Sequence, residues 1–230
     1  MRRAHQNRRS RSLAAASAAG LAIALLTPGV AHAQPRVAIV AAQTTEFPPA
    51  FQLVDVQQRL QATGQFAAVD IINTVPSTPT LAQLAQYNSV IVWTNSTPAN
   101  ANTWGDVMAD YVDAGGGVVV AVFANTSTTT ARRLQGRWLT GGYEIIPSAR
   151  GTTTGGALLG AVLQPAHPIM QGVQTFDGGS SSFRPTTEEV CATCTKVALW
   201  TDGKTLVAVH DTRPRRADLG FYPVPAGSSS

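Results

Sequence analysis

The side chains that could carry acid–base or metal chemistry are few and widely spaced. His167 and His210 have no Cys or Glu beside them at the spacing of a metal site, which needs three or four ligands. We therefore interpret His167 as a turn residue whose ring bonds to the backbone before Pro168, and we predict no metal site and no cofactor. Glu46, His167 and Asp177 remain as catalytic candidates, on condition that the fold brings the imidazole within hydrogen-bond reach of a carboxylate.

Polar side chains follow three apolar runs that have the composition of buried parallel strands. Ligands of open α/β sheets bind where such strands end, so these side chains are predicted to converge. They could form hydrogen bonds to a sugar or another small polar ligand, and the alternative interpretation is that they only solvate the strand ends. The ligand-binding candidates are Gln43 and Thr44, Asn95 and Ser96, and Asn125, Thr126 and Ser127.

The N-terminus has the three parts of an export signal. Five arginines precede an apolar run from Leu13 to Leu26, and Ala31-His32-Ala33 matches a small-x-small cleavage site. The apolar run is shorter than the ~20 residues that span a membrane, which favours cleavage after Ala33 over a membrane anchor. We expect a periplasmic or extracellular protein with no stable membrane insertion after cleavage. The pattern does not separate the general export route from the twin-arginine route.

The charge balance changes when the leader is removed. The whole chain has 17 basic and 13 acidic residues, and removal of the five leader arginines leaves 12 basic residues and a net charge of −1. Nucleic-acid binding needs a persistent basic footprint, so the composition argues against a nucleic-acid partner. Arg213, Arg215 and Arg216 are too few to define an anion-binding patch, and we predict a solvated turn there.

Cys191 and Cys194 are the only cysteines of the chain and form a Cys-x-x-Cys motif. In an exported protein this spacing favours a local disulfide. A redox site is one alternative, but the motif precedes a predicted strand, so it lacks the helix dipole that lowers a thiol pKa. Free thiols are a further alternative, as is half of a zinc site, whose second half is missing from the sequence.

Strand and helix patterns alternate over the first half of the exported chain. Apolar runs predict strands at residues 37–42, 66–72, 89–93 and 118–123. Apolar stripes at three- and four-residue spacing predict helices that begin near residues 48, 80 and 102. The alternation and the short connections predict a mostly parallel sheet with right-handed crossovers. Residues 130–139 are predicted to be helical, and the state of residues 158–163 is ambiguous.

The C-terminal third predicts antiparallel strands added to one side of this sheet. Residues 196–200 and 205–209 flank Asp202-Gly203, a strong hairpin signal. Residues 219–222 predict a last strand. The chain is therefore expected to hold one α/β domain over residues 34–225, between the leader and a disordered tail at 226–230.

Three segments resemble class I glutamine-amidotransferase-like domains, particularly the ThuA-like branch. They are residues 87–93, the strand-preceding block 105–120 with its Gly115-Gly116-Gly117 turn, and the His-Pro-Ile segment 167–173. The resemblance extends over about Arg36 to Pro223 and implies a flavodoxin-like three-layer sandwich. Catalytic members carry a Cys nucleophile after the strand that follows the Gly-rich turn, and a late His and Glu two residues apart.

This chain departs from that catalytic pattern. The corresponding turn, residues 123–127, contains no Cys, and His210 is followed by Asp211 and Thr212 with no Glu. The closing C-terminal helix of the family is also not evident in the sequence. The first hypothesis is thus an exported, non-catalytic module that binds a small polar ligand, such as a sugar, or a protein partner. The alternative is a ThuA-like carbohydrate-active enzyme or hydrolase that uses Glu46, His167 and Asp177 in a strand-end cleft. The oligomeric state is not predicted.

Overall fold

The computed structural model describes residues 33–44, 50–180 and 183–223. The leader up to His32, the candidate Glu46 and the tail at 226–230 lie outside the described residues. Eight strands form one sheet in the order β2-β1-β3-β4-β10-β9-β8-β6, and β5 and β7 form a separate two-stranded ribbon. The strands are β1 (Arg36–Ala42), β2 (Ala68–Asn73), β3 (Ser89–Thr94), β4 (Gly117–Ala121), β5 (Thr152–Thr153), β6 (Leu159–Val162), β7 (Arg184–Pro185), β8 (Cys194–Trp200), β9 (Thr205–His210) and β10 (Arg216–Leu219).

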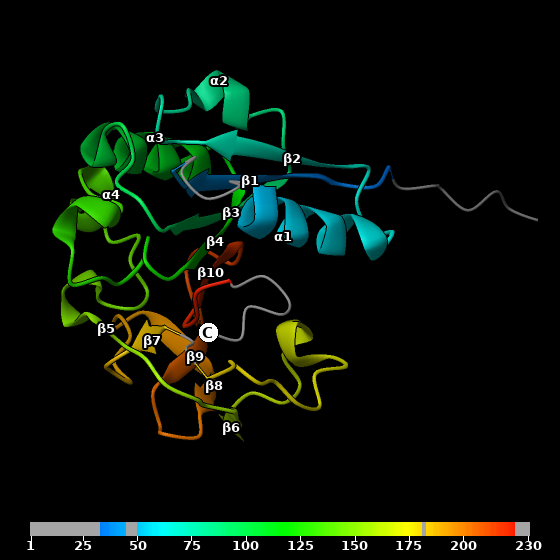
Figure 1. The fold of residues 1–230 in the computed structure, drawn as a ribbon, viewed down its shortest axis with the longest axis vertical. Helices are drawn as coiled ribbons and strands as arrows, with labels where there is room; N and C mark the ends of the chain where they lie inside the picture. The colour runs from blue at the N-terminus through cyan, green and yellow to red at the C-terminus, as the bar shows by residue number, and fades with distance from the viewer. Residues whose placement is uncertain (1–32, 45–49, 181–182, 224–230) are drawn as a thin grey trace, which may run out of the picture. The chain divides into compact units, whose positions relative to one another are not determined.

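Strands β2, β1, β3 and β4 pair in parallel and make the half of the sheet that was predicted from the apolar runs (Figure 1). The helices are α1 (Ala50–Ala62), α2 (Leu81–Leu84), α3 (Ala101–Asp113) and α4 (Arg137–Thr140), with 3₁₀ turns η1 (Thr130–Arg132), η2 (Ser148–Arg150) and η3 (Pro168–Met170). The predicted helix at 130–139 is therefore wrong as a continuous element. It is divided into η1 and α4, and Gly136 between them has the positive φ of 58° that glycine tolerates.

Alternate residues of β1 face two different helical layers. Ile39 packs in a buried cluster with Leu53 of α1, whereas Val40 packs with Trp104 and Met108 of α3. Side chains of a strand alternate between the two faces of a sheet, so α1 and α3 cover opposite faces of the parallel half. This is the three-layer arrangement that was expected, and it explains why β1 has buried residues on both sides.

The other half of the sheet is antiparallel, as predicted. Strand β10 pairs in parallel with β4 and antiparallel with β9, and β9 continues through the hairpin to β8 and then β6. The last strand was predicted at residues 219–222, and the structure places it at Arg216–Leu219. The predicted solvated turn is also wrong for Arg216, whose side chain is buried and forms an ion pair with buried Asp218 at 2.6 Å. Within the described residues, no helix is long and apolar enough to cross a membrane.

Candidate functional site

Three adjacent parallel strands end beside one another in a row of small and polar side chains. Ala42, the last residue of β1, is in register with Thr94 of β3. Because Ala41 is in register with Asn73 of β2, the residue after it, Thr74, continues the same row on the other side of Ala42. The two threonine side chains therefore flank an alanine methyl group on the face of the sheet that α3 covers.

Several buried polar atoms at this carboxyl edge have no hydrogen-bond partner among the described residues. They include the hydroxyl oxygens of Thr74 and Thr94 and the Oε1 atom of Gln43. Trp104 Nε1, in the first turn of α3, is another atom of this kind. Buried polar groups in folded proteins are nearly always paired, so such a group calls for a ligand or an ordered water. Gln43 was a sequence candidate, but Thr74 and Thr94 were not.

The other candidates after β1 and β3 join the two strand ends. The Thr44 backbone N–H donates to Ser96 Oγ at 2.9 Å, and the backbone N–H groups of Asn95 and Ser96 both donate to the Ala42 carbonyl. Asn95 and Ser96 are partly buried, and Thr44 is exposed. These candidates therefore lie together at the edge where Thr94 ends β3, as the parallel arrangement predicts.

The turn after β4 is buried, and its polar side chains bond to the backbone. Asn125 Nδ2 donates to the Leu219 carbonyl at 3.1 Å, and Thr126 Oγ1 donates to the Gly151 carbonyl at 2.9 Å. Ser127 Oγ accepts the Thr129 backbone N–H at 3.0 Å. All three side chains are less than 5% exposed. The hydrogen bonds of Asn125 and Thr126 attach the turn to β10 and to the residue that precedes β5. All three side chains therefore have a structural role in the described residues.

The side chains of His167 and Asp177 form only local hydrogen bonds within the part of the chain that the structure describes. His167 Nδ1 accepts the Ile169 backbone N–H at 3.2 Å and thereby caps η3, which is the turn role expected for it. Asp177 is exposed, and its Oδ1 accepts the Gly179 N–H at 2.8 Å. Segment 163–177 follows β6, the outermost strand, whereas Asn95 follows β3 near the other end of the strand order. No described contact joins the imidazole to a carboxylate.

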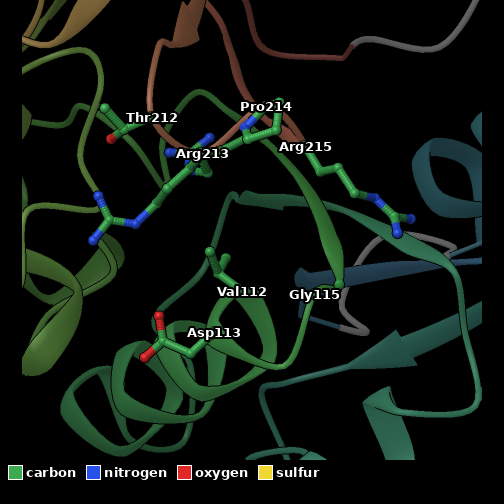
Figure 2. Close-up of a pocket in the computed structure, with 9 residues that line it drawn as sticks. Val112, Asp113, Gly115, Thr212, Arg213, Pro214 and Arg215 are labelled. Atoms are coloured by element: carbon green, nitrogen blue, oxygen red, sulfur yellow. The ribbon is translucent and has the colours of Figure 1, made fainter.

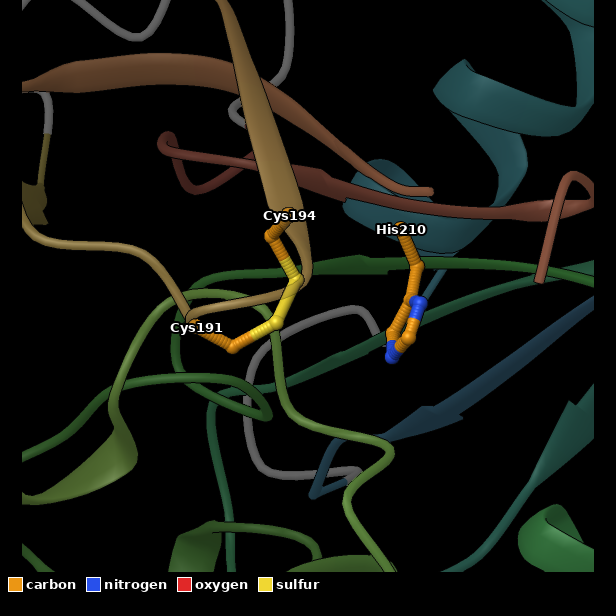
Figure 3. Close-up of side chains that lie close together, drawn as sticks. All are labelled: Cys191, Cys194 and His210. Atoms are coloured by element: carbon orange, nitrogen blue, oxygen red, sulfur yellow. A yellow bond between two sulfur atoms is a disulfide. The ribbon is translucent and has the colours of Figure 1, made fainter. Parts of the chain in front are cut away.

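Cys191 and Cys194 form a disulfide, with the sulfur atoms 1.95 Å apart, and His210 lies next to it (Figure 3). Cys194 begins β8 and His210 ends β9, and the two residues are in register across the antiparallel pair. Burial lowers the pKa of His210 below its usual value. The Gly142 carbonyl opposes this shift, whereas the charge of Arg213 adds to it. The shift favours the neutral form of the imidazole.

Two small pockets lie at the amino ends of the parallel strands, away from the carboxyl edge. One, of about 260 Å³, is bounded by the end of α3 and by the β9–β10 connection, and Figure 2 shows Asp113 and Arg213 on its two sides. Arg213 donates to the Gly141 and Gly142 carbonyls, and its guanidinium group stacks 4.3 Å from the centre of the Tyr143 ring. Burial and the hydrogen bond to Asp113 raise the pKa of Tyr143.

The second pocket, of about 200 Å³, shares Gly115, Gly116 and Arg215 with the first. Arg215 donates to the Asn88 carbonyl at 2.5 Å. Both pockets are smaller than the ~300–1,000 Å³ of most ligand sites. Arg213 and Arg215 already donate hydrogen bonds to backbone carbonyls at these pockets. The amino edge of the sheet therefore gives weaker support for ligand binding than the unpartnered atoms at the carboxyl edge.

The layered sheet, parallel over one half, defines an α/β domain with a flavodoxin-like fold. Among solved structures, it is similar to two ThuA-like proteins. One is from Bacteroides uniformis (16% identity, TM-score 0.57, 89% of each chain covered), and the other is from Parabacteroides merdae (16% identity, TM-score 0.52, 84% of this chain and 81% of that one). A glutamine amidotransferase from Thermotoga maritima is similar at 9% identity, with a TM-score of 0.52 over 83% of this chain and 76% of that one. No protein-family model and no curated protein sequence matches this chain. The likenesses support the resemblance at the level of the fold.

Proposed function

We propose that this chain is an exported, non-catalytic module on an amidotransferase-like scaffold, and that it binds a small polar ligand at the carboxyl edge of β2, β1 and β3. The observation that carries the binding proposal is the set of buried polar atoms without partners at that edge, above all the hydroxyl groups of Thr74 and Thr94. A polyol or sugar supplies hydroxyl groups that donate and accept, which is the chemistry these atoms require.

The non-catalytic part of the proposal is supported by the state of the expected nucleophile position. Covalent acyl transfer on this scaffold needs an activated nucleophile on an accessible turn. Both cysteines of the chain are joined in the disulfide. The hydroxyl groups in the turn after β4 belong to Thr126 and Ser127, which are buried and bonded to the backbone. The described contacts thus offer neither a thiolate nor a free hydroxyl there.

The binding proposal is tested with a matched pair of threonine variants. Thr94 and Thr126 are both 0% exposed, but only the Thr126 hydroxyl has a partner. Thr94→Val should leave the melting temperature of the free protein unchanged or raise it, because it removes an unpaired buried polar group. Thr126→Val should lower the stability by about 0.5–1.5 kcal/mol, because it removes the hydrogen bond to the Gly151 carbonyl, which keeps only the Thr186 backbone N–H at 3.3 Å.

The ligand response is measured by thermal shift on the purified chain without its leader, against glucose, galactose, N-acetylglucosamine, glycerol and the neutral amino acids. A ligand at 100 times its Kd adds about 2.7 kcal/mol. That is about 5–11 °C for a domain of this size. We expect at least one such shift in the wild type and in Thr126→Val, and its loss in Thr94→Val. A flat response in the wild type, or an equal response in Thr94→Val, contradicts the proposal and assigns these atoms to a trapped water.

The alternative of a carbohydrate-active enzyme or hydrolase receives no specific support from the described contacts. His167 caps η3 and Asp177 bonds within its own turn, so neither is brought to the strand ends by a described hydrogen bond. Glu46 is outside the described residues. The function that the geometry favours is therefore binding.

A further inference from the structure

Strand pairing brings a third metal-binding side chain to the Cys-x-x-Cys motif. The register between β8 and β9 places His210 directly opposite Cys194, and the turn at 191–194 adds Cys191. Directly opposed residues in an antiparallel pair have Cβ atoms about 4.5–5.5 Å apart. In accordance with this, one ring nitrogen and the two sulfur atoms all lie within 4.8 Å of one another (Figure 3).

We propose that reduction of the Cys191–Cys194 disulfide opens a metal site in which two thiolates and the His210 imidazole bind a borderline-soft cation of the Zn²⁺ class. The fourth position of the tetrahedron is left to water or to another ligand. In the oxidised form the sulfurs are bonded to each other, so the site is closed. The metal site is therefore gated by the redox state of the disulfide.

The donor set and its geometry suit such a cation. Thiolate and imidazole are the common ligands of zinc, with Zn–S distances of about 2.3 Å. Tetrahedral geometry then separates the two sulfurs by about 3.8 Å. The Cα atoms of the two cysteines are 5.1 Å apart. Rotation of the two Cys side chains can thus give the required separation without unwinding of the turn.

The surroundings of His210 supply the outer contact that metal-bound histidines usually have. A ligating imidazole normally donates its second N–H to a carbonyl or another acceptor, which fixes the ring. Here Nε2 lies 3.2 Å from the Gly142 carbonyl, and Nδ1 lies 3.3 Å from the Thr212 hydroxyl. The ring nitrogen that coordinates the cation would give up its present contact, and the other nitrogen would keep its own. The ring is also buried, at 2% exposure, which restricts its motion.

The local charges are compatible with a divalent cation once the thiols have lost their protons. Arg213 Nη1 lies 3.1 Å from His210 Nε2, and a bare cation beside it would be repelled. Two thiolates carry a charge of −2, so a bound Zn²⁺ makes the ligand set neutral.

The opening step is an ordinary thiol–disulfide exchange. An external dithiol supplies two electrons and two protons, the S–S bond breaks, and two Cys thiols form while the dithiol becomes a disulfide. Binding of Zn²⁺ then releases the two thiol protons to solvent. An external disulfide reverses the exchange: it takes two electrons from the Cys thiolates and two protons from solvent, becomes a dithiol, and the Cys191–Cys194 bond that forms expels the cation and closes the site.

The test uses Co²⁺, whose visible and near-ultraviolet absorption reports tetrahedral geometry and thiolate ligation. The purified chain without its leader is titrated under anaerobic conditions, once oxidised and once reduced with a phosphine. We expect one equivalent of Co²⁺ to bind to the reduced protein, with thiolate-to-metal bands that disappear when Zn²⁺ is added. The oxidised protein should show none of these bands. Absence of the bands after reduction, or equal binding by both forms, overturns the proposal.

Variants separate a three-ligand site from binding by the two sulfurs alone. His210→Asn should weaken metal binding by at least about tenfold, which is the lower end of the effect of outer-shell changes. The matched control is His167→Asn, at the other histidine of the described residues, which caps η3. This variant should leave the metal affinity unchanged. An affinity of His210→Asn equal to that of the wild type contradicts the role assigned to the imidazole.

A second measurement covers the case in which the buried His210 variant does not fold. X-ray absorption of the Zn²⁺-loaded, reduced wild type should show two sulfurs at about 2.3 Å and one imidazole nitrogen at about 2.0–2.1 Å. A sulfur-only or oxygen-rich first shell overturns the proposal without any variant.

Discussion

Replacement of Asp218 by Asn should destabilise the domain by about 3–5 kcal/mol, because it leaves the Arg216 guanidinium group as a buried charge without its counter-ion. Both side chains are at most 1% exposed, and Arg216 Nη2 lies 2.6 Å from Asp218 Oδ1. Asp218 Oδ2 also accepts the Ile146 backbone N–H at 3.0 Å, and Arg216 Nε donates to the Tyr143 carbonyl at 3.1 Å. The pair thus fixes the segment 143–146 to β10 in the middle of the sheet.

The loss is measured by urea unfolding and by thermal melting followed by circular dichroism. A domain of this size shifts by about 2–4 °C per kcal/mol, so the melting temperature should fall by about 6–20 °C. The control is Glu189→Gln, which breaks the Arg150–Glu189 pair at 2.6 Å. Both partners of that pair are 53% exposed, so the loss should stay below about 1 kcal/mol.

Two results would refute this reasoning. One is a loss in Asp218→Asn as small as that of the exposed control. The other concerns the double variant Arg216→Gln with Asp218→Asn, which removes both charges but keeps an amide donor for the Tyr143 carbonyl and an amide oxygen for the Ile146 N–H, and which should cost less than Asp218→Asn because no isolated charge is left. A double variant that is much less stable than the single one would show that packing of the β10 side chains, rather than their charge, dominates.

Three further outcomes are expected. Gly105→Ala should cost about 1–3 kcal/mol in urea unfolding, because a Cβ there would lie 1.9 Å from the Gln135 backbone carbonyl oxygen. Burial acts to raise the pKa of Asp202, but the hydrogen bonds from Arg184 and from the Lys204 backbone N–H, together with the charges of both residues, outweigh it and leave the pKa below the usual value. Stability from this pair is therefore present above about pH 4 and is lost as the pH falls through the native pKa, and Asp202→Asn should flatten that dependence in acid melts. Reduction of the disulfide should cost about 2 kcal/mol, the loop-closure value for four residues, and should leave the far-ultraviolet spectrum of the domain unchanged.

The parallel half of the sheet could be predicted from the sequence because its signals are local. Buried strands such as β1 are continuous apolar runs, and α3 carries its buried Trp104 and Met108 at four-residue spacing. The last strand was predicted at residues 219–222 instead of 216–219 because charged residues are expected at the surface, and Arg216 and Asp218 are buried. The ion pair between the two residues permits their burial, and no pattern in the sequence predicts that pair.

The candidate site depends on register, which a single sequence does not give. Thr74 and Thr94 look like ordinary strand-end residues, and their importance appears only when the pairing with β1 places them on either side of Ala42. The same is true of His210, which is 16 residues from Cys194 in the sequence and opposite it in the sheet. A metal-ligand spacing in the sequence detects ligands that share a loop or a helix, and it misses a ligand contributed by strand pairing.

The Arg216–Asp218 ion pair and the group formed by Cys191, Cys194 and His210 both contact the segment 142–146. Asp218 accepts the Ile146 N–H, and the carbonyl of the preceding residue, Ile145, accepts the Cys191 N–H at 2.9 Å. The Gly142 carbonyl lies 3.2 Å from His210 Nε2. Reduction of the disulfide breaks none of these backbone contacts. Cys191 and His210 therefore keep their positions after the sulfurs separate, and a site whose ligands are held by supporting hydrogen bonds binds without first ordering the chain. The same ion pair that stabilises the centre of the sheet would thus position the proposed metal ligands.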